Sequence, residues 1–293
     1  MGNLKSCKTI TELYRFITEE FGPTVNRDFL RYKSEGEYRG ISYSQFKTET
    51  DLFAFGLASL GIKREDKIAI ISENRPEWIN SDMAILALGA IDIPLYPSLT
   101  AASIEFILNN SEANTVIVSN KFQLNKILKI LGKCRHIKNI IILNEKDYDP
   151  SINHLYTFRQ IQDKGKLFKK EDPNLLTESM KLVKESDVCT IIYTSGTTGE
   201  PKGVILTHRN IMSNVEAALI SFPIDKNDVF LSFLPLCHIF ERMAGYYTAV
   251  SSGAMICYAE SIETVANNLI EVKPTLLTTV PRLFERIYSK IMK

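Results

Sequence analysis

The sequence TIIYTSGTTGEPKGVILTHRN, residues 190–210, determines how the rest of the chain is interpreted. A β-branched apolar run at residues 190–193 passes into a loop of hydroxyls and glycines at residues 194–199, and Lys202 follows. Glycines let the backbone turn tightly and expose its N–H groups, hydroxyls add short donors, and a lysine adds a mobile positive charge. These residue types together suit the binding of a triphosphate.

The Walker phosphate-binding loop is a competing interpretation of this stretch. It requires G-x-x-x-x-G-K-[ST] opening directly into a helix. Counting from Gly196, the sixth position is Pro201, and Lys202 is followed by residues 203–207, which favour a strand. The loop is therefore predicted to join two strands, with the next helix starting near His208. A flexible Gly/Ser/Thr hairpin that binds no phosphate is the remaining alternative.

Residues 193–203, YTSGTTGEPKG, resemble the signature [YF]-T-S-G-[ST]-T-G-x-P-K-G of the acyl-adenylate-forming (AMP-binding) superfamily and match it at every position. Residues 234–242, LPLCHIFER, are similar to the long-chain fatty acid CoA ligase branch of that superfamily. So are residues 89–100, GAIDIPLYPSLT, and residues 280–288, VPRLFERIY. The resemblance covers nearly the whole chain.

The resemblance implies a role for the loop in binding the β- and γ-phosphates of ATP, which leaves the α-phosphorus open to a carboxylate. The residues expected to bind ATP are Thr194, Ser195, Gly196, Thr197, Thr198, Gly199 and Lys202. Thr194 is also expected to lie close to the Mg²⁺ that leaves with pyrophosphate. His238, at the end of a predicted strand, is expected to border the adenylate and acyl pocket and to orient the carboxylate. Lys202 and His238 are the predicted catalytic residues.

Several neighbouring side chains have two interpretations. Cys237 is adjacent to a predicted catalytic residue, but nothing nearby supplies a matching base, so we interpret it as packing. Thr207 and His208 either face phosphate or start a helix, and we favour the helix start. Tyr246 and Tyr247 are expected either to line an acyl tunnel or to belong to the ordinary core.

The composition argues against several classes of partner and site. Lys+Arg number 35 and Asp+Glu 34, so the net charge of +1 gives no global field for nucleic acid, and no nucleic-acid partner is expected. The five cysteines are widely spaced and include no C-x-x-C pair, which argues against disulfide frameworks and zinc sites and fits a reducing cytosol. No partner protein is evident.

The sequence also bears on location. The longest apolar run, residues 83–91, is far shorter than the ~20 residues that span a bilayer. A cytoplasmic protein is expected, with peripheral contact to a membrane left open. Gly2 and Ser6 match the myristoylation pattern M-G-x-x-x-[ST], which is also common by chance.

Elsewhere, apolar strands alternate with helices, which is typical of an α/β fold whose mainly parallel sheets are flanked by helices on both faces. A β-hairpin is expected at residues 29–43, and further strands at residues 67–72, 91–96, 115–119, 139–143, 229–233, 254–258 and 275–280. Helices are expected at residues 9–21, 43–60, 76–88, 101–110, 122–131, 208–222, 240–252, 262–271 and 281–293.

These elements are expected to form a single, partial N-terminal AMP-binding domain. Residues 1–143 are predicted to be its first α/β half, and residues 187–293 its phosphate-loop half. Between them, residues 144–186 carry many charges and are predicted to be a surface excursion with only a short helix around residues 158–162.

The resemblance implies ATP-dependent activation of a medium- or long-chain fatty acid to an acyl-adenylate and then to acyl-CoA. Its expected cofactors and partners are ATP, Mg²⁺, coenzyme A and the fatty acid. Adenylation of an aryl or amino acid is one alternative, and an inactive fragment or a non-catalytic binding module is another. Because three further family motifs do not occur here, the chain is expected to be part of a longer enzyme and inactive alone.

Overall fold

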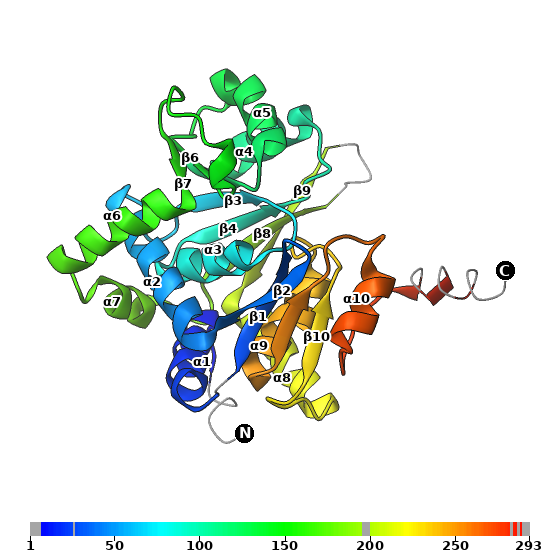
Figure 1. The fold of residues 1–293 in the computed structure, drawn as a ribbon. Helices are drawn as coiled ribbons and strands as arrows, with labels where there is room; N and C mark the ends of the chain where they lie inside the picture. The colour runs from blue at the N-terminus through cyan, green and yellow to red at the C-terminus, as the bar shows by residue number, and fades with distance from the viewer. Residues whose placement is uncertain (1–6, 26, 195–199, 282–283, 286–287, 289–293) are drawn as a thin grey trace.

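The fold is seen in a computed structural model, which describes residues 7–25, 27–194, 200–281, 284–285 and 288. It is an α/β fold with two mainly parallel sheets and helices packed around them (Figure 1). The fold class predicted from the sequence is therefore confirmed.

The larger sheet has seven strands in the order β7-β6-β5-β3-β4-β8-β9. Neighbouring strands run parallel except for the last pair, β8 and β9, which is antiparallel. The strands are β3 (Lys67–Ile71), β4 (Ile91–Leu95), β5 (Thr115–Val118), β6 (Asn139–Ile142), β7 (Leu155–Thr157), β8 (Val188–Thr194) and β9 (Lys202–Thr207).

Alternate residues of this sheet face two separate hydrophobic cores. Ile68 and Ile70 of β3 pack with helices on one face, whereas Ala69 and Ile71 pack with helices on the other. The first face is covered by α2 (Tyr43–Ser59), α3 (Pro76–Ala87) and α6 (Phe158–Glu171), and the second by α4 (Ala101–Ser111) and α5 (Lys121–Ile130). Burial on both faces explains why these strands are continuously apolar.

The smaller sheet has four strands in the order β10-β11-β1-β2. Its hairpin turns at Glu35 and Gly36, which both have positive φ, as the predicted turn at these residues requires. β1 also pairs in parallel with β11, so this sheet joins the beginning of the chain to its later part. The strands are β1 (Asp28–Ser34), β2 (Glu37–Ser42), β10 (Val229–Ser232) and β11 (Met255–Tyr258).

The remaining elements surround these sheets. The α-helices are α1 (Ile10–Thr24), α7 (Leu175–Leu182), α8 (His208–Ser221), α9 (Thr248–Ser252) and α10 (Val265–Val272). A π-helix, η4 (Glu241–Tyr247), leads directly into α9, so residues 240–252 are helical as predicted but are not one regular α-helix. Two short 3₁₀ helices are η2 (Leu131–Lys133) and η3 (Glu145–Asp147).

Residues 144–186 differ from the prediction of a surface excursion with a short helix. They contain an edge strand of the larger sheet, β7, and the 14-residue helix α6, followed by α7. Helix α6 packs closely on α2: a Cβ atom on Gly165 would lie 1.9 Å from the carbonyl oxygen of Leu52. The apolar positions Phe158, Ile161 and Gly165 form a narrow buried stripe, which the many charges on the other face of α6 obscured in the sequence.

Two further predictions concern the end of the chain. The strand predicted at residues 275–280 is wrong, because Leu276 makes only an isolated bridge with Phe230. The helix predicted at residues 281–293 lies largely outside the described residues. The division into residues 1–143, 144–186 and 187–293 remains a prediction, although strands from the first and last of these ranges share both sheets.

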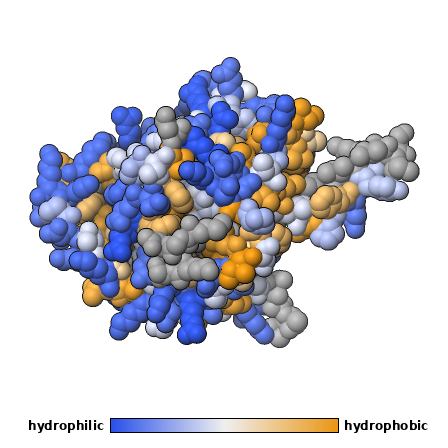
Figure 2. Space-filling model, turned by 90° about the horizontal axis from the view of Figure 1, so that it is seen from below, coloured by the Kyte–Doolittle hydropathy of each residue, from blue (hydrophilic) through white to orange (hydrophobic). Residues whose placement is uncertain are grey.

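Figure 2 shows the molecule from below, on the side where α1 and α8 lie in Figure 1. Hydrophobic surface occurs there in separate patches between hydrophilic side chains. Among the described residues, no helix has both the length and the apolar character that crossing a membrane requires.

Candidate functional site

The predicted phosphate loop closes the antiparallel hairpin of β8 and β9. Thr194, the last residue of β8, is paired in register with Lys202, the first residue of β9, and both are exposed. This confirms that two strands flank the loop, rather than a strand and a helix as in a Walker site. The loop residues between them, Ser195, Gly196, Thr197, Thr198 and Gly199, lie outside the described residues.

The loop end of the hairpin is fixed by a tyrosine and a glycine on opposite strands. Tyr193 pairs with Gly203, and a Cβ atom on that glycine would lie 3.2 Å from Cζ of the tyrosine ring and 2.9 Å from Cγ2 of Ile191. The Tyr193 hydroxyl donates a 2.6 Å hydrogen bond to Asn110 Oδ1 on α4. The first and last residues of the YTSGTTGEPKG stretch therefore hold the two ends of the loop together against the sheet.

His238 lies in the segment that follows β10, at the carboxyl end of the smaller sheet. Its side chain is exposed, and its Nδ1 accepts a 3.2 Å hydrogen bond from the Phe240 backbone N–H. Its own backbone N–H donates to the carbonyl oxygen of Pro235, at 2.9 Å. Among the described residues, no hydrogen bond or ion pair joins His238 to Thr194 or Lys202.

Cys237, next to this histidine, is buried, and burial raises the pKa of its thiol to about 12. The thiol is therefore protonated at neutral pH and is no nucleophile, which agrees with its interpretation as a packing residue.

Arg242 connects the phosphate-loop strand to the segment that carries His238. Its Nη1 donates to Thr190 Oγ1 on β8, at 2.9 Å, and its backbone N–H donates to the carbonyl oxygen of His238, at 3.1 Å. Arg242 thus contacts both parts of the candidate site, β8 through its side chain and the His238 segment through its backbone. The sequence interpretation gave this arginine no role.

The surroundings of Arg242 are strongly charged for a fully buried site. Its Nη2 donates to Asp82 on α3 and to Asp92 on β4, and its Nε donates to the Tyr247 hydroxyl, at 3.1 Å. The guanidinium carbon also lies 5.5 Å from the centre of the Trp78 ring. Burial raises the pKa of Asp92 to about 6, and the positive charge of Arg242 opposes that shift. The network therefore depends on both the cation and the aromatic cover around it.

A sequence signal for this network exists. Asp82 directly precedes the longest apolar run, and Asp92 lies inside the apolar strand β4. Acidic residues in such runs are buried on folding, and a buried carboxylate needs a partner. The sequence does not show which lysine or arginine pairs with Asp82 and Asp92.

Glu241, the neighbour of Arg242, is buried in a different environment. Ser232 Oγ donates to its Oε1 at 2.6 Å, and its Oε2 has no hydrogen-bond partner. Burial raises the pKa of Glu241 to about 8, and the hydrogen bond from Ser232 partly offsets the shift. The carboxyl group therefore holds its proton at neutral pH.

The other polar residues weighed from the sequence lie in structural positions. Thr207 caps α8 in a capping box, and the adjacent His208 is buried with Nδ1 accepting from the Ile10 N–H, at 3.2 Å. Burial lowers the pKa of His208 to about 4. The expectation of a helix start is confirmed.

Tyr246 and Tyr247 are fully buried, and their rings stack with centres 4.5 Å apart, which favours the core interpretation over an acyl tunnel.

The Mg²⁺ predicted beside Thr194 can be tested against the donors present. Mg²⁺ in nucleotide sites is usually held by one or two carboxylates together with phosphates and water. Among the described residues, no cluster of three or more His, Cys, Asp or Glu side chains is arranged to hold a metal. Thr194 supplies a hydroxyl alone, so these residues do not form a magnesium site by themselves.

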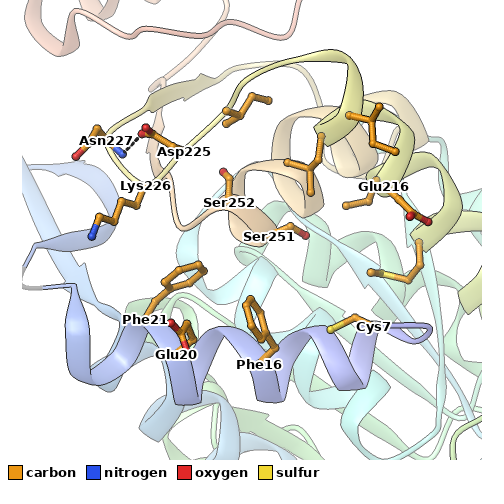
Figure 3. Close-up of a pocket in the computed structure, with 15 residues that line it drawn as sticks. Cys7, Phe16, Glu20, Phe21, Glu216, Asp225, Lys226, Asn227, Ser251 and Ser252 are labelled. Atoms are coloured by element: carbon orange, nitrogen blue, oxygen red, sulfur yellow. Dashed lines mark hydrogen bonds between the residues drawn. The ribbon is translucent and has the colours of Figure 1, made fainter. Parts of the chain in front are cut away.

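A groove of about 340 Å³ lies between α1, α8 and α9 (Figure 3). Phe16 and Phe21 of α1 face it from one side, and Ser251 and Ser252 of α9 from another. None of the predicted site residues lines this groove, so it is separate from the candidate site.

Comparison with known proteins identifies the family to which the chain belongs. The family model of AMP-binding enzymes matches residues 20–293. The chain belongs to the AMP-binding enzyme family. The match contains both the β8–β9 hairpin and the segment with His238, so the two parts of the candidate site fall within the family's own domain.

Relatives of this AMP-binding protein include fatty acyl-CoA synthetase A of Dictyostelium discoideum, which is 34% identical over 97% of this chain. Long-chain-fatty-acid–CoA ligase ACSBG2 of Xenopus laevis is 30% identical over 97% of the chain. The chain spans 42% and 38% of the length of these two proteins. It therefore corresponds to less than half of each relative.

Solved structures show the same fold. A long-chain-fatty-acid-CoA ligase (FadD1) from Archaeoglobus fulgidus has a TM-score of 0.74 and 20% identity, with 97% of this chain and 54% of that one covered. The anthranilate CoA ligase AuaEII has a TM-score of 0.70 and 21% identity, with 90% and 49% covered. At these identities the likeness shows the fold alone.

Proposed function

We propose that this chain is the ATP-binding part of an enzyme that activates a fatty acid as its acyl-adenylate and then forms the acyl-CoA. The observation that carries the proposal is the β8–β9 hairpin, whose loop has the complete YTSGTTGEPKG sequence and whose ends are fixed by Tyr193 and Gly203. A loop rich in glycines and hydroxyls, held at both ends on a rigid sheet, is suited to surround a triphosphate.

In this proposal each residue acts through charge or position. Lys202 begins β9 at the exposed end of the hairpin, where its ammonium would neutralise phosphate charge while a carboxylate approaches. Thr194, paired with it in register, adds a hydroxyl to the same end, and Mg²⁺ would arrive with the triphosphate. The exposed His238 would orient the carboxylate, with Arg242 fixing its segment against β8.

The choice of a fatty acid rests on sequence and not on the fold. Structures with this fold include the anthranilate CoA ligase and the protein VinN in complex with L-aspartate, so the fold alone does not select a substrate. The relatives at 30–34% identity are named for fatty acyl or long-chain fatty acid substrates. Adenylation of an aryl or amino acid remains the second candidate.

The rest of the proposal follows from this reaction. Coenzyme A would be the second substrate, and the relatives' greater length supports a need for further protein to complete the reaction. A cytoplasmic location with peripheral membrane contact fits a water-soluble nucleotide and an apolar acid, and it stays a prediction.

The test measures ATP–pyrophosphate exchange in the full-length protein with fatty acids, aryl acids and amino acids as competing substrates. Lys202→Ala should weaken ATP use by ~10²-fold or more, because one preorganised charge-stabilising donor contributes that much. It should leave fatty acid binding and the melting temperature unchanged, since Lys202 is exposed. Lys129→Ala, at an exposed position on α5, is the control. Unchanged KM for ATP and unchanged kcat in Lys202→Ala would contradict the proposal.

A further inference from the structure

Asn74 connects the two sheets at the candidate site. It follows β3 of the larger sheet, in the sequence ISENRPEW, and its side chain reaches the segment after β10 of the smaller sheet. Its Nδ2 donates to the carbonyl oxygen of Leu234 at 2.7 Å, and its Oδ1 accepts from the Leu236 backbone N–H at 2.9 Å. The segment held in this way is the start of LPLCHIFER, which runs on to His238.

The hydrogen bonds of Asn74 also involve Ser232, the last residue of β10. The second N–H of Nδ2 donates to Ser232 Oγ, at 3.1 Å. Ser232 has a single hydroxyl proton, which it gives to Glu241 Oε1, so its oxygen is left to accept from the asparagine. An amide N–H can only donate, so Ser232 Oγ is the acceptor of this bond between the two sheets, and it links Asn74 to the buried Glu241 on η4.

The polarity of these contacts permits only one orientation of the amide. A flipped amide would set Oδ1 against the Leu234 carbonyl and Nδ2 against the Leu236 N–H, so that both pairs would repel. Asn74 has donor and acceptor atoms at the positions where this segment offers an acceptor and a donor, an arrangement that neither Asp nor Ala can reproduce.

We propose that Asn74 is a positioning residue for adenylate formation, because it holds the Leu234–Leu236 backbone that carries His238 to the carboxyl ends of both sheets. Its effect reaches the reaction through that backbone and not through contact with substrate. This inference rests on the proposed function, and it adds a residue that the phosphate loop and LPLCHIFER do not contain.

Two substitutions in the full-length protein test this Asn74 clamp, the three hydrogen bonds that join Asn74 to Ser232, Leu234 and Leu236. Asn74→Ala removes the three hydrogen bonds, whereas Asn74→Asp keeps an acceptor for the Leu236 N–H, loses both donors and sets a negative oxygen against the Leu234 carbonyl. Asn80→Ala is the matched control, since Asn80 is buried on α3 and donates to Thr50 Oγ1 at 2.9 Å, away from the clamped segment.

The first measurement is hydrogen–deuterium exchange of the peptide that contains residues 233–240. Exchange at Leu236 should rise by about tenfold in Asn74→Ala, as the loss of one net hydrogen bond implies, and by less in Asn74→Asp, which keeps an acceptor for this N–H. Asn80→Ala should leave it unchanged. Equal exchange in the wild type and Asn74→Ala would overturn the clamp, and should that variant fail to fold, the kcat of Asn74→Asp against that of Asn80→Ala decides.

The second measurement is the split between kcat and KM in pyrophosphate exchange. Both Asn74 variants should lower kcat for adenylate formation while the KM for ATP stays within about twofold, because the phosphate loop is held by other contacts. Faster hydrogen–deuterium exchange at Leu236 with unchanged kcat would overturn the positioning role. A wild-type protein without adenylation activity would refute the proposed function. The hydrogen–deuterium exchange data would still show whether the Asn74 clamp exists.

Discussion

Arg242 Nη2 lies 3.0 Å from Asp92 Oδ1, and both side chains are fully buried. The same nitrogen also donates to Asp82, so one guanidinium serves two carboxylates from different elements, α3 and β4. Because Arg242 additionally contacts Thr190 on β8, this network joins a helix, two strands and η4 beneath the candidate site. Removing Arg242 from this network should therefore lower the stability of the whole fold rather than break one local contact.

The first prediction concerns Arg242→Met. Without the cation, Asp82 and Asp92 would face each other unpaired in the core, so the free energy of unfolding should fall by about 3–5 kcal/mol. Urea unfolding measures the loss. Arg15→Met is the control: its pair with Glu19 is exposed, and such pairs contribute about 0–1 kcal/mol. Adding Asp82→Asn and Asp92→Asn to Arg242→Met should restore part of the stability. Equal losses in the two single variants would contradict a structural role for the network.

The second prediction uses the titration of Glu241. Its folded pKa of about 8 lies above the ordinary value of 4.5, so its contribution to stability is full below pH 4.5 and is lost as the pH rises through about 8. Glu241→Gln cannot ionise and keeps an acceptor for Ser232. The variant should therefore gain stability relative to the wild type between pH 5 and about pH 8.5, at up to about 1.4 kcal/mol per unit of pKa difference. Urea unfolding at both pH values measures it. A stability difference that is the same at both pH values would show that this carboxyl is not the titrating group.

The third prediction concerns His208, whose shift has the opposite effect. Its pKa of about 4 lies below the ordinary value of 6.5, so the unfolded chain takes up the proton first as the pH falls. The stability that neutral His208 contributes is present above pH 6.5 and is lost between pH 6.5 and about 4. His208→Asn keeps an acceptor for the Ile10 N–H and should flatten the pH dependence of unfolding in that window. His136→Asn, at an exposed position, is the control, and the idea fails if both variants unfold with wild-type pH dependence.

The fourth prediction tests the packing of α6 on α2. Gly165→Ala would place a Cβ atom 1.9 Å from the Leu52 carbonyl oxygen, so α6 must shift, and the free energy of unfolding should fall by about 1–3 kcal/mol or more. Gly132→Ala is the matched control, because a Cβ atom there would meet nothing within 4 Å. Chemical denaturation of both variants checks the difference. A Gly165→Ala protein as stable as Gly132→Ala would mean that this helix does not pack as described.

The two strands that flank the predicted phosphate loop could be predicted because their signals are local. The β8–β9 hairpin was evident from the failure of the Walker pattern after Gly196 and from the β-favouring residues that follow. The role of Asn74 could not be predicted, since its partners lie about 160 residues further along the chain. Strand β7 and the full length of α6 were missed for a similar reason, because their burial depends on α2 and the sheet edge.

The sequence by itself determined the alternation of strands and helices, the turn at Glu35 and Gly36, and the start of α8 at Thr207, because each depends on residues close together in the chain. Only the tertiary structure decided that the cation for Asp82 and Asp92 is Arg242, from 160 and 150 residues away. The physical reason is that a charge becomes costly only when it is buried. The chain's order does not show which distant elements will exclude water from it.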